Sequence, residues 1–529
     1  MKLTPKQIFD KVEKLKGDRI TFEDHWQELA DYIQPNKNDI NRYTVPGDKR
    51  NTHLYDSSAI QANNLLASAL HGMLTSPTNP WFGLTSGEEK IDKMDNVRFW
   101  LQKVEKTIFN ILNNSNFQTE MHEVYLDLGC FGTAALAIEE DEELFVRFSA
   151  KHIREVFVQE DARGNIDEVY RSYKYTAQQI VNEYGIENVS KKVKNSFEKG
   201  MADKYDVIHA IYKEYGKENA IWEYHSQHVL VDDLKELRYG FFKEMPIVVP
   251  RWTKTTGEIY GRSPGMNALP DIKMINEVMK TTIRGAQKTV DPPLMLPDDG
   301  FVLPIITKPG GLNYYRAGSA DRIETFANDA KIDFGYQVMD DMRARIRDAF
   351  FIDQLQLQQG PQMTATEVNQ RTEEKMRLLG PMLGRQQSEL LRPLVNRVFE
   401  ILIRRNVIKK SEIPQELSGR KLDVHYTSFI AKVQKTQDAN NLLRAVQLAA
   451  PFIQSDPASM DIINADEAVK YVLGVYGVAQ EVQRTKEEIK AVRQGRAEQQ
   501  QAQQQQVNQG INIDQAKGIS EIVSQQKLK

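Results

Sequence analysis

Two clusters of side chains in this sequence have the residue types from which metal sites are built. The first is Glu223 with His225 and His228, since imidazole nitrogens are common metal ligands. Residues 225 and 228 of a strand point to opposite faces, so a structural role is the stronger interpretation. The second cluster is the acidic run at 139–143, whose carboxylates could bind a hard cation. This run lies between two predicted strands, where we expect a solvated loop.

Cys130 is the only cysteine among 529 residues, which excludes a disulfide framework. It lies among apolar and small residues in the stretch 128–132, and no histidine or asparagine can be nominated beside it. We therefore expect a packed thiol and not a nucleophile. The sequence also has no GxxxxGK[ST] motif for nucleotide hydrolysis. These observations predict no enzyme, no metal and no cofactor.

Basic side chains are instead concentrated on a long amphipathic helix that is predicted at 266–290. Proline ends this helix at Asp291-Pro292-Pro293, because it lacks an N–H and restricts the residue before it. The charged side chains of this helix form a stripe on one face. Such a stripe is most often solvated, but in a ring of these helices the charged stripe would face either solvent or a central channel. The apolar residues recur at steps of three and four and form one stripe: Ile272, Ile275, Met279, Ile283, Ala286 and Val290.

A second amphipathic helix is predicted at 331–352, after roughly forty residues interrupted by prolines and by Gly310-Gly311. Two helices joined by a non-helical tip form a stalk that projects from the body of a protein. Such a stalk cannot bury its apolar stripes alone, so it predicts neighbours, most simply other copies of the chain. The apolar side of the second helix carries Phe334, Val338, Met342, Ile346 and Phe350.

The region before the stalk is predicted to be helical first and then rich in strands. An apolar stripe from Phe22 to Ile33 indicates a helix that ends at Pro35. Strands are expected from about residue 133 to 249, with a turn at 161–165. Within them, Thr176 and Gln179 have the spacing of a capping box that opens a short helix. The apolar pair Trp81-Phe82 is expected to be structural.

Helices are also predicted after the stalk. Thr364 and Glu367 have the spacing of another capping box, which opens a long helix with kinks expected at Pro381 and Pro393. A short strand and further helices follow, and the residues from Glu498 onwards are rich in glutamine, a composition typical of disorder. The fold class that these elements predict is α+β and predominantly helical.

The charge balance limits the possible partners. Lys and Arg number 69 against 73 Asp and Glu, which gives a net charge of −4. A tight, static nucleic-acid binder usually has a marked basic excess, so only loose contact with DNA is compatible with this composition. No apolar run reaches the length of a membrane span, and the N-terminus has no signal-peptide pattern, so we expect a soluble protein with no membrane partner.

Several short segments of the chain occur together in an order that is known from one family. They are Asp56-Ser57-Ser58-Ala59, 65–70, 74–77, 81–84, 132–136, Asp291-Pro292-Pro293, 363–368, 380–385 and 389–394. In these segments, over residues 20–430, the chain resembles the portal, or head-to-tail connector, proteins of short-tailed T7-like double-stranded DNA bacteriophages. The Gln-rich C-terminus does not carry the resemblance.

The resemblance implies a ring of identical subunits, commonly twelve, at one capsid vertex. Double-stranded DNA would pass through the ring without sequence recognition. The other implied partners are the terminase large subunit, tail adaptors, and the major capsid and scaffolding proteins. The chain would reside at the head–tail junction of the virion and in the host cytoplasm during assembly. The implied domains are a wing at 1–265, stem helices at 266–290 and 331–352, a clip at 291–330, a tunnel loop at 353–363, a long wing helix at 364–420, and a crown with the Gln-rich tail at 421–529.

Two sets of candidate binding residues follow from this mapping. Mixed charge in a channel allows weak contacts with phosphates, whereas a purely basic channel would hold the duplex in place. In the tunnel loop, glutamine amides can donate weak hydrogen bonds to phosphates, although the loop could equally be a solvated connection. The DNA-channel candidates are Lys273, Lys280, Arg284, Lys288, Arg343, Arg345, Arg347, Gln354, Gln356, Gln358 and Gln359. The clip candidates for partner binding are Pro293, Pro297, Pro304, Gly310, Tyr314 and Tyr315.

Two alternatives to a portal remain at the level of the sequence. One is a ring-forming tail adaptor or scaffold-like virion protein that binds proteins and does not translocate DNA. The other is a nuclease or phosphatase that uses the acidic run. The width of an axial hole in a purified ring would separate the first from a portal, and an assay for metal-dependent DNA cleavage would test the second.

Overall fold

The computed structural model describes residues 2–92, 94–214, 223–295, 304–307, 312–314, 324–325, 332–355, 380–417, 423–426, 429–455, 462, 464–475, 484 and 488–501. Contacts divide the chain into two compact units. The first comprises Met1–Gly83, Val104–Glu412 and Val424–Phe429, and the second comprises Leu84–Lys103, Ile413–Asp423 and Ile430–Lys529. Among the described residues, no helix has the length and apolar character needed to cross a bilayer.

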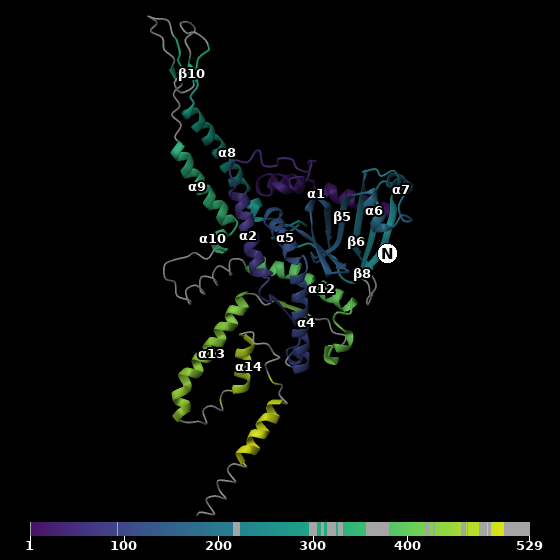
Figure 1. Cartoon of the computed structure of the whole chain (residues 1–529), viewed down its shortest axis with the longest axis vertical. Helices are drawn as coiled ribbons and strands as arrows, with labels where there is room; N and C mark the ends of the chain where they lie inside the picture. The colour runs from purple at the N-terminus through teal and green to yellow at the C-terminus, as the bar shows by residue number, and fades with distance from the viewer. Residues whose placement is uncertain are drawn as a thin grey trace, which may run out of the picture. The chain divides into compact units, whose positions relative to one another are not determined.

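Helices α1 (Pro5–Ile33), α2 (Ser58–Leu74) and α5 (Phe117–Phe131) pack together in the first unit (Figure 1). Helix α1 ends just before Pro35, as predicted. It begins at a capping box of Thr4 and Gln7 that the sequence analysis overlooked, although its spacing is visible in the sequence. The Trp26 indole N–H donates to the Phe131 carbonyl at 3.1 Å, which joins α1 to the end of α5.

Most strands of the first unit belong to two antiparallel sheets. A three-stranded sheet has the order β3-β2-β9, with bounds Phe145–Lys151, Ala135–Asp141 and Ile247–Val248. The other sheet is a five-stranded meander in chain order. Its strands are β4 (Val156–Glu160), β5 (Ile166–Thr176), β6 (Lys204–Lys213), β7 (Tyr224–Leu230) and β8 (Lys235–Phe242).

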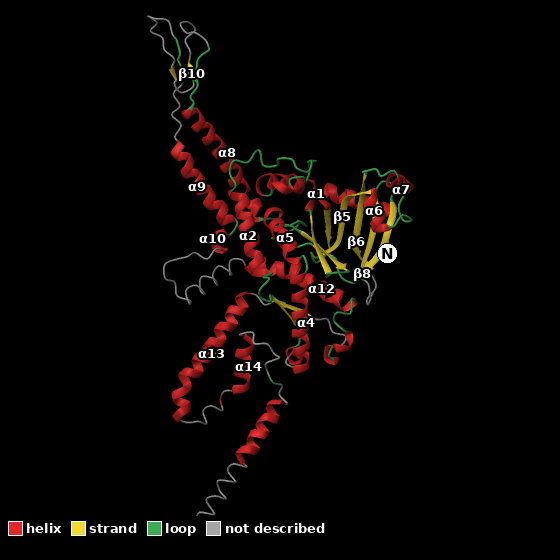
Figure 2. Cartoon of the chain, in the orientation of Figure 1, coloured by secondary structure: helices red, strands yellow, loops and turns green. Residues whose placement is uncertain are grey.

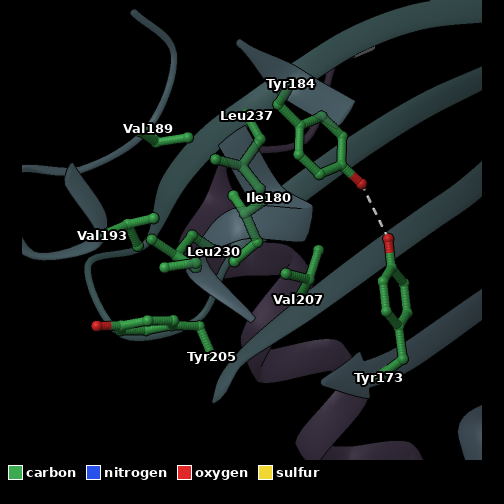
Figure 3. Packing of buried hydrophobic residues seen from close by; sticks show 10 residues of the cluster. Tyr173, Ile180, Tyr184, Val189, Val193, Tyr205, Val207, Leu230 and Leu237 are labelled. Atoms are coloured by element: carbon green, nitrogen blue, oxygen red, sulfur yellow. Dashed lines mark hydrogen bonds between the residues drawn. The ribbon is translucent and has the colours of Figure 1, made fainter. Parts of the chain in front are cut away.

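Helices cover both faces of the five-stranded sheet. On one face, α6 (Ala177–Tyr184) and α7 (Lys191–Glu198) pack over a buried cluster that includes Val207, and the hydroxyls of Tyr173 and Tyr184 lie 3.0 Å apart (Figure 3). On the other face, the first turns of α1 pack on a cluster that includes Ile208. Neighbouring residues 207 and 208 thus serve opposite cores, because successive side chains of a strand alternate between faces.

The stalk consists of α8 (Pro264–Val290) and α9 (Ile332–Ala349), followed by the short α10 (Ile352–Leu355). Helices α8 and α9 lie side by side and extend beyond the sheets and helices of the first unit (Figure 2). Beyond them, β10 (Leu294–Met295) pairs antiparallel with β11 (Glu324–Thr325). The helix–excursion–helix pattern of the sequence therefore folds into a helical hairpin, here called the stem.

The remaining described elements are mostly short and are spread along the chain. A helix from residue 380 contains a π-helical turn, η3 (Gln387–Leu391), and continues as α12 (Arg392–Arg404). The other elements are η1 (Pro35–Lys37), β1 (Phe82–Thr85), α3 (Glu89–Asp92), α4 (Asp95–Asn114), η2 (Ile153–Glu155), η4 (Lys410–Glu412), η5 (Gln415–Leu417), β12 (Asp423–Tyr426), α13 (Phe429–Ser455) and α14 (Ala465–Val475). Residues 488–501 are also helical.

Several local predictions are confirmed, and some boundaries differ. The capping box of Thr176 and Gln179 opens α6, and the turn at 161–165 joins β4 to β5, with Gly164 at φ +81°. The long helix after the stem ends at Arg404, short of residue 420, and a π-helical turn directly precedes Pro393. Proline removes one backbone hydrogen bond from the helix at this point. The predicted capping box of Thr364 and Glu367 lies outside the described residues.

Candidate functional site in the stem

The apolar stripe of α8 is buried at the base of the stem and exposed towards its tip. Ile272 and Ile275 are 3% and 2% exposed, whereas Ile283 is 38% and Val290 is 87% exposed. On α9 and directly after it, the apolar residues Met342, Ile346 and Phe350 near the base are buried, whereas Tyr336 is 53% exposed. Near the tip, a groove of about 770 Å³ is lined by Ile283, Ala286, Val290, Tyr336 and neighbouring polar residues. The distal stem therefore presents apolar surface that the described residues of its own subunit do not cover.

The two stem helices approach closely at one glycine. A Cβ atom built on Gly335 would lie 2.8 Å from Oγ1 of Thr282, so any other residue here would require the Thr282 side chain or the helices to shift. Nearer the base, the Arg345 guanidinium lies 4.0 Å from a carboxylate oxygen of Asp271. The hairpin is thus a defined pair of helices.

The predicted channel cations of α8 fall into two groups. Lys273 pairs with Glu28 at 2.9 Å, and Lys280 pairs with Glu277 at 3.0 Å. Arg284 and Lys288 are exposed near the tip. Within the described part of the chain, no carboxylate lies within ion-pair distance of these two side chains. Charge is therefore balanced at the base of α8 and positive at its distal end.

The predicted channel cations of α9 are paired to different degrees. Arg347 pairs with Asp353 at 2.8 Å, and Arg345 is 70% exposed. Arg343 is directed at Asp56, which lies just before α2, and the Nη2–Oδ2 distance is 2.9 Å. Since the Asp56 side chain is only 5% exposed, Arg343 neutralises a nearly buried carboxylate.

The tunnel-loop and clip candidates lie partly outside the described residues. Gln354 is partly buried in α10, and its backbone N–H donates to the Phe351 carbonyl at 3.2 Å. Pro293, Pro304 and Tyr314 are exposed. The candidates outside the described residues are Gln356, Gln358, Gln359, Pro297, Gly310 and Tyr315.

The histidines of the five-stranded sheet have structural surroundings. The His225 Nδ1 atom lies 2.7 Å from the Tyr239 hydroxyl, and the His228 Nδ1 atom lies 3.0 Å from the Tyr184 hydroxyl. The His228 ring also stacks on His209, with 3.9 Å between the ring centroids. Burial, together with nearby arginines, lowers the pKa of His228 to about 4, so the ring is neutral near pH 7. Among the described residues, no group of three or more acidic, histidine or cysteine side chains could hold a metal ion.

Cys130 and the acidic run also have structural roles. Cys130 is fully buried, and burial raises the pKa of its thiol well above the ordinary value. In the acidic run, an Asp141 carboxylate oxygen accepts the N–H groups of Glu143 and Leu144, each at 2.9 Å. Glu140 pairs with Arg404 at 2.8 Å. These contacts confirm a packed thiol. The expectation of a solvated loop at 139–143 is wrong for 139–141, which pair with β3 as the end of β2, and only 142 and 143 of the run lie in the turn.

A buried ion cluster surrounds Arg251, which is 2% exposed and is not among the residues predicted from the sequence. Its guanidinium pairs with Glu389 of the π-helical turn at 2.8 Å and with Glu160 at the end of β4. It also donates to the carbonyls of Gly164 and Ile259, each at 3.1 Å. The available signal was an arginine that follows the apolar run at 247–249 and Pro250, where a charge needs a partner.

Comparisons with known proteins cover most of the chain. Residues 5–483 match the family model described as "Bacteriophage head to tail connecting protein". The chain is 30% identical over 527 residues to the "Probable portal protein" of Bordetella phage BPP-1, which covers 96% of this chain and 94% of the relative. It is 30% identical over 518 residues to the "Portal protein" of Salmonella phage epsilon15, and this match covers 94% of this chain and 92% of the relative. It is 23% identical over 463 residues to the "Portal protein" of Enterobacteria phage T3, and this match covers 84% of this chain and 82% of the relative.

Proposed function

The chain belongs to the family of bacteriophage head-to-tail connecting proteins, and on that premise we propose how its stem serves the phage particle. Copies of the chain form the ring-shaped portal at a capsid vertex, which conducts double-stranded DNA and joins the head to the tail. We propose twelve copies in the ring. The family is structural, and we assign no catalytic role to any residue of the chain.

The exposed apolar surface near the tip of the stem is the observation that carries this proposal. Val290 is 87% exposed, and its full burial would contribute about 1.5 kcal/mol or more for each copy. In a closed ring, every subunit offers the same groove to one neighbour and the same stem helix to the other. The groove around Ile283 and Tyr336 would then receive the stem of the adjacent subunit, and the stems together would form the wall of the channel.

The charge pattern of the stem supports a conduit and not a tight DNA-binding site. Lys273, Lys280 and Arg347 are paired within their own subunit, so they attract phosphates weakly. Arg284 and Lys288 border the groove around Ile283. We propose that in the ring they lie at the edge of the subunit contact that faces the channel, where they supply its main phosphate contacts. Each cation that neutralises a phosphate releases counterions and strengthens binding, so a small number of unpaired cations permits the duplex to slide.

The other assignments complete this proposal. We propose that the described parts of 291–330, including the exposed Pro293, Pro304 and Tyr314, belong to the clip, where the terminase large subunit and tail adaptors bind in turn. The wing would contact the major capsid and scaffolding proteins, and residues 421–529 would form the crown. Assembly would take place in the host cytoplasm, and the mature ring would remain in the virion.

A matched pair of α8 variants tests the proposal. Ile283→Asp places a charge in the apolar groove, whereas Thr281→Asp places the same charge at an exposed neighbouring position that does not line it. Electron microscopy and mass measurement should show a ring with a hole about as wide as duplex DNA for the wild type and for Thr281→Asp. Ile283→Asp should remain folded and lose the ring. A ring without such a hole would contradict a portal and favour a tail adaptor, and intact rings from both variants would refute the stem contact.

A further inference from the structure

We infer that the segment 53–56 is a strap that fixes the tilt of the stem on the body of the subunit, with Asn276 and Arg343 as positioning residues. The segment connects the loop after α1 to the start of α2, and it contacts both stem helices. The inference rests on the proposed function, because the tilt of the stem matters only if stems form a channel wall. Arg343 is therefore left out of the proposed phosphate contacts.

The first attachment is to α8 through Asn276, which is 4% exposed. Its side-chain oxygen accepts the Tyr55 N–H at 2.7 Å, and its amide nitrogen donates to the His53 carbonyl at 3.1 Å. An amide is a side chain that supplies a donor and an acceptor at once, as two backbone groups of an adjacent segment require. Asparagine is a poor helix former, so its position in the middle of α8 is explained by this contact.

The second attachment is to α9 through Arg343. Its Nη2 and Nε atoms both donate to the same carboxylate oxygen of Asp56, at 2.9 and 3.2 Å. The other carboxylate oxygen of Asp56 accepts the Ser58 N–H at 2.8 Å, at the first residue of α2. Burial alone would raise the pKa of Asp56, but the hydrogen bonds from Ser58 and Arg343 outweigh burial and lower it. One carboxylate thus holds both the start of α2 and the side of α9.

The strap is anchored to the body of the subunit at its other end. The His53 Nε2 atom lies 2.9 Å from the Asp31 carbonyl oxygen of α1, and the His53 ring packs edge-on against Tyr32. The strap therefore runs from α1 to α2 and meets α8 and α9 between these two anchors. No other described loop connects these four helices through such polar contacts.

The strap contacts α8 close to a proline that weakens the helix. Pro270 lies inside the helix and removes one backbone hydrogen bond, which makes this turn the weakest point of the helix. Asn276 lies beyond Pro270 towards the tip. About 20 Å of helix follow Asn276, so a rotation of about 5° at the strap would move the tip by about 2 Å. Repeated around a ring, this movement would change the width of the channel.

Two arginine variants with the same change of charge test the strap. Arg343→Gln and Arg345→Gln each remove one positive charge from α9, but only Arg343 contacts the strap. Hydrogen exchange of the full-length assembled protein should be about tenfold faster in the strap and in α9 for Arg343→Gln and unchanged for Arg345→Gln. Cryo-electron microscopy should show a wider spread of stem tilts only for Arg343→Gln.

Two further variants keep the test decisive. Asp56→Asn retains an acceptor for Ser58 and loses the ion pair, so it should reproduce the effect of Arg343→Gln, and the double variant should add nothing more. Equal exchange in Arg343→Gln and Arg345→Gln, or wild-type exchange in both Arg343→Gln and Asp56→Asn, would overturn the inference. If the wild type forms no ring, the proposed function fails, and the exchange comparison still decides whether the strap exists.

Discussion

Replacing Arg251 with methionine should destabilise the first unit by about 3–5 kcal/mol, the cost of removing one partner from a buried ion pair. The change leaves Glu389 and Glu160 without their shared cation, and their side chains are only 18% and 15% exposed. Each carboxylate keeps one other cation, since Arg385 lies 2.9 Å from Glu389 and Lys254 lies 2.7 Å from Glu160. The lower end of the range, about 3 kcal/mol, is therefore expected.

Denaturant unfolding followed by tryptophan fluorescence would measure this change, because Trp252 adjoins the cluster and is buried. Arg251→Lys should lie between the wild type and Arg251→Met, since an ammonium group cannot reproduce the planar fork of the guanidinium. Adding Glu389→Leu to Arg251→Met should restore part of the stability, because it removes a largely buried carboxylate that has lost one of its two cations. A loss of stability below about 0.5 kcal/mol in Arg251→Met would refute the reasoning, because substitutions of exposed surface residues usually change the stability by no more than this amount.

Three further predictions concern other parts of the chain. Trp81→Ala should cost about 3–5 kcal/mol, because Trp81 is 3% exposed and packs on Phe82 and Phe117; an unchanged melting temperature with loss of the ring would place Trp81 at a subunit interface instead. Stability should fall by up to about 3 kcal/mol as the pH drops from 6.5 to 4, because the unfolded chain takes up a proton at His228 that the folded sheet rejects, and His228→Gln should flatten this dependence. Replacing three tunnel-loop glutamines with alanine should preserve the ring and lower the fraction of particles that retain full-length DNA, whereas normal retention would leave this loop as a linker: Gln356, Gln358 and Gln359.

Features with a local cause could be predicted from the sequence. The stem follows from apolar spacing and from the prolines at 292–293, and α8 ends at Val290 as expected. Helix α1 ends before Pro35, and α6 begins at the capping box of Thr176 and Gln179. Each of these signals lies within about one turn of the structure that it specifies, so no knowledge of the fold was needed. The family resemblance rests on short segments of the same kind.

The tertiary structure decided which charged residues are available for function. Arg343 and Arg345 look alike in the sequence, yet only Arg343 reaches Asp56, which lies 287 residues away. Arg251 and Glu389 are separated by 138 residues, and the stripe of α8 is buried at Ile275 and exposed at Val290. Periodicity shows which face of a helix is apolar, because it depends on neighbours three and four residues apart. Ion-pair partners and burial depend on which distant segments meet, and only the packed fold determines that.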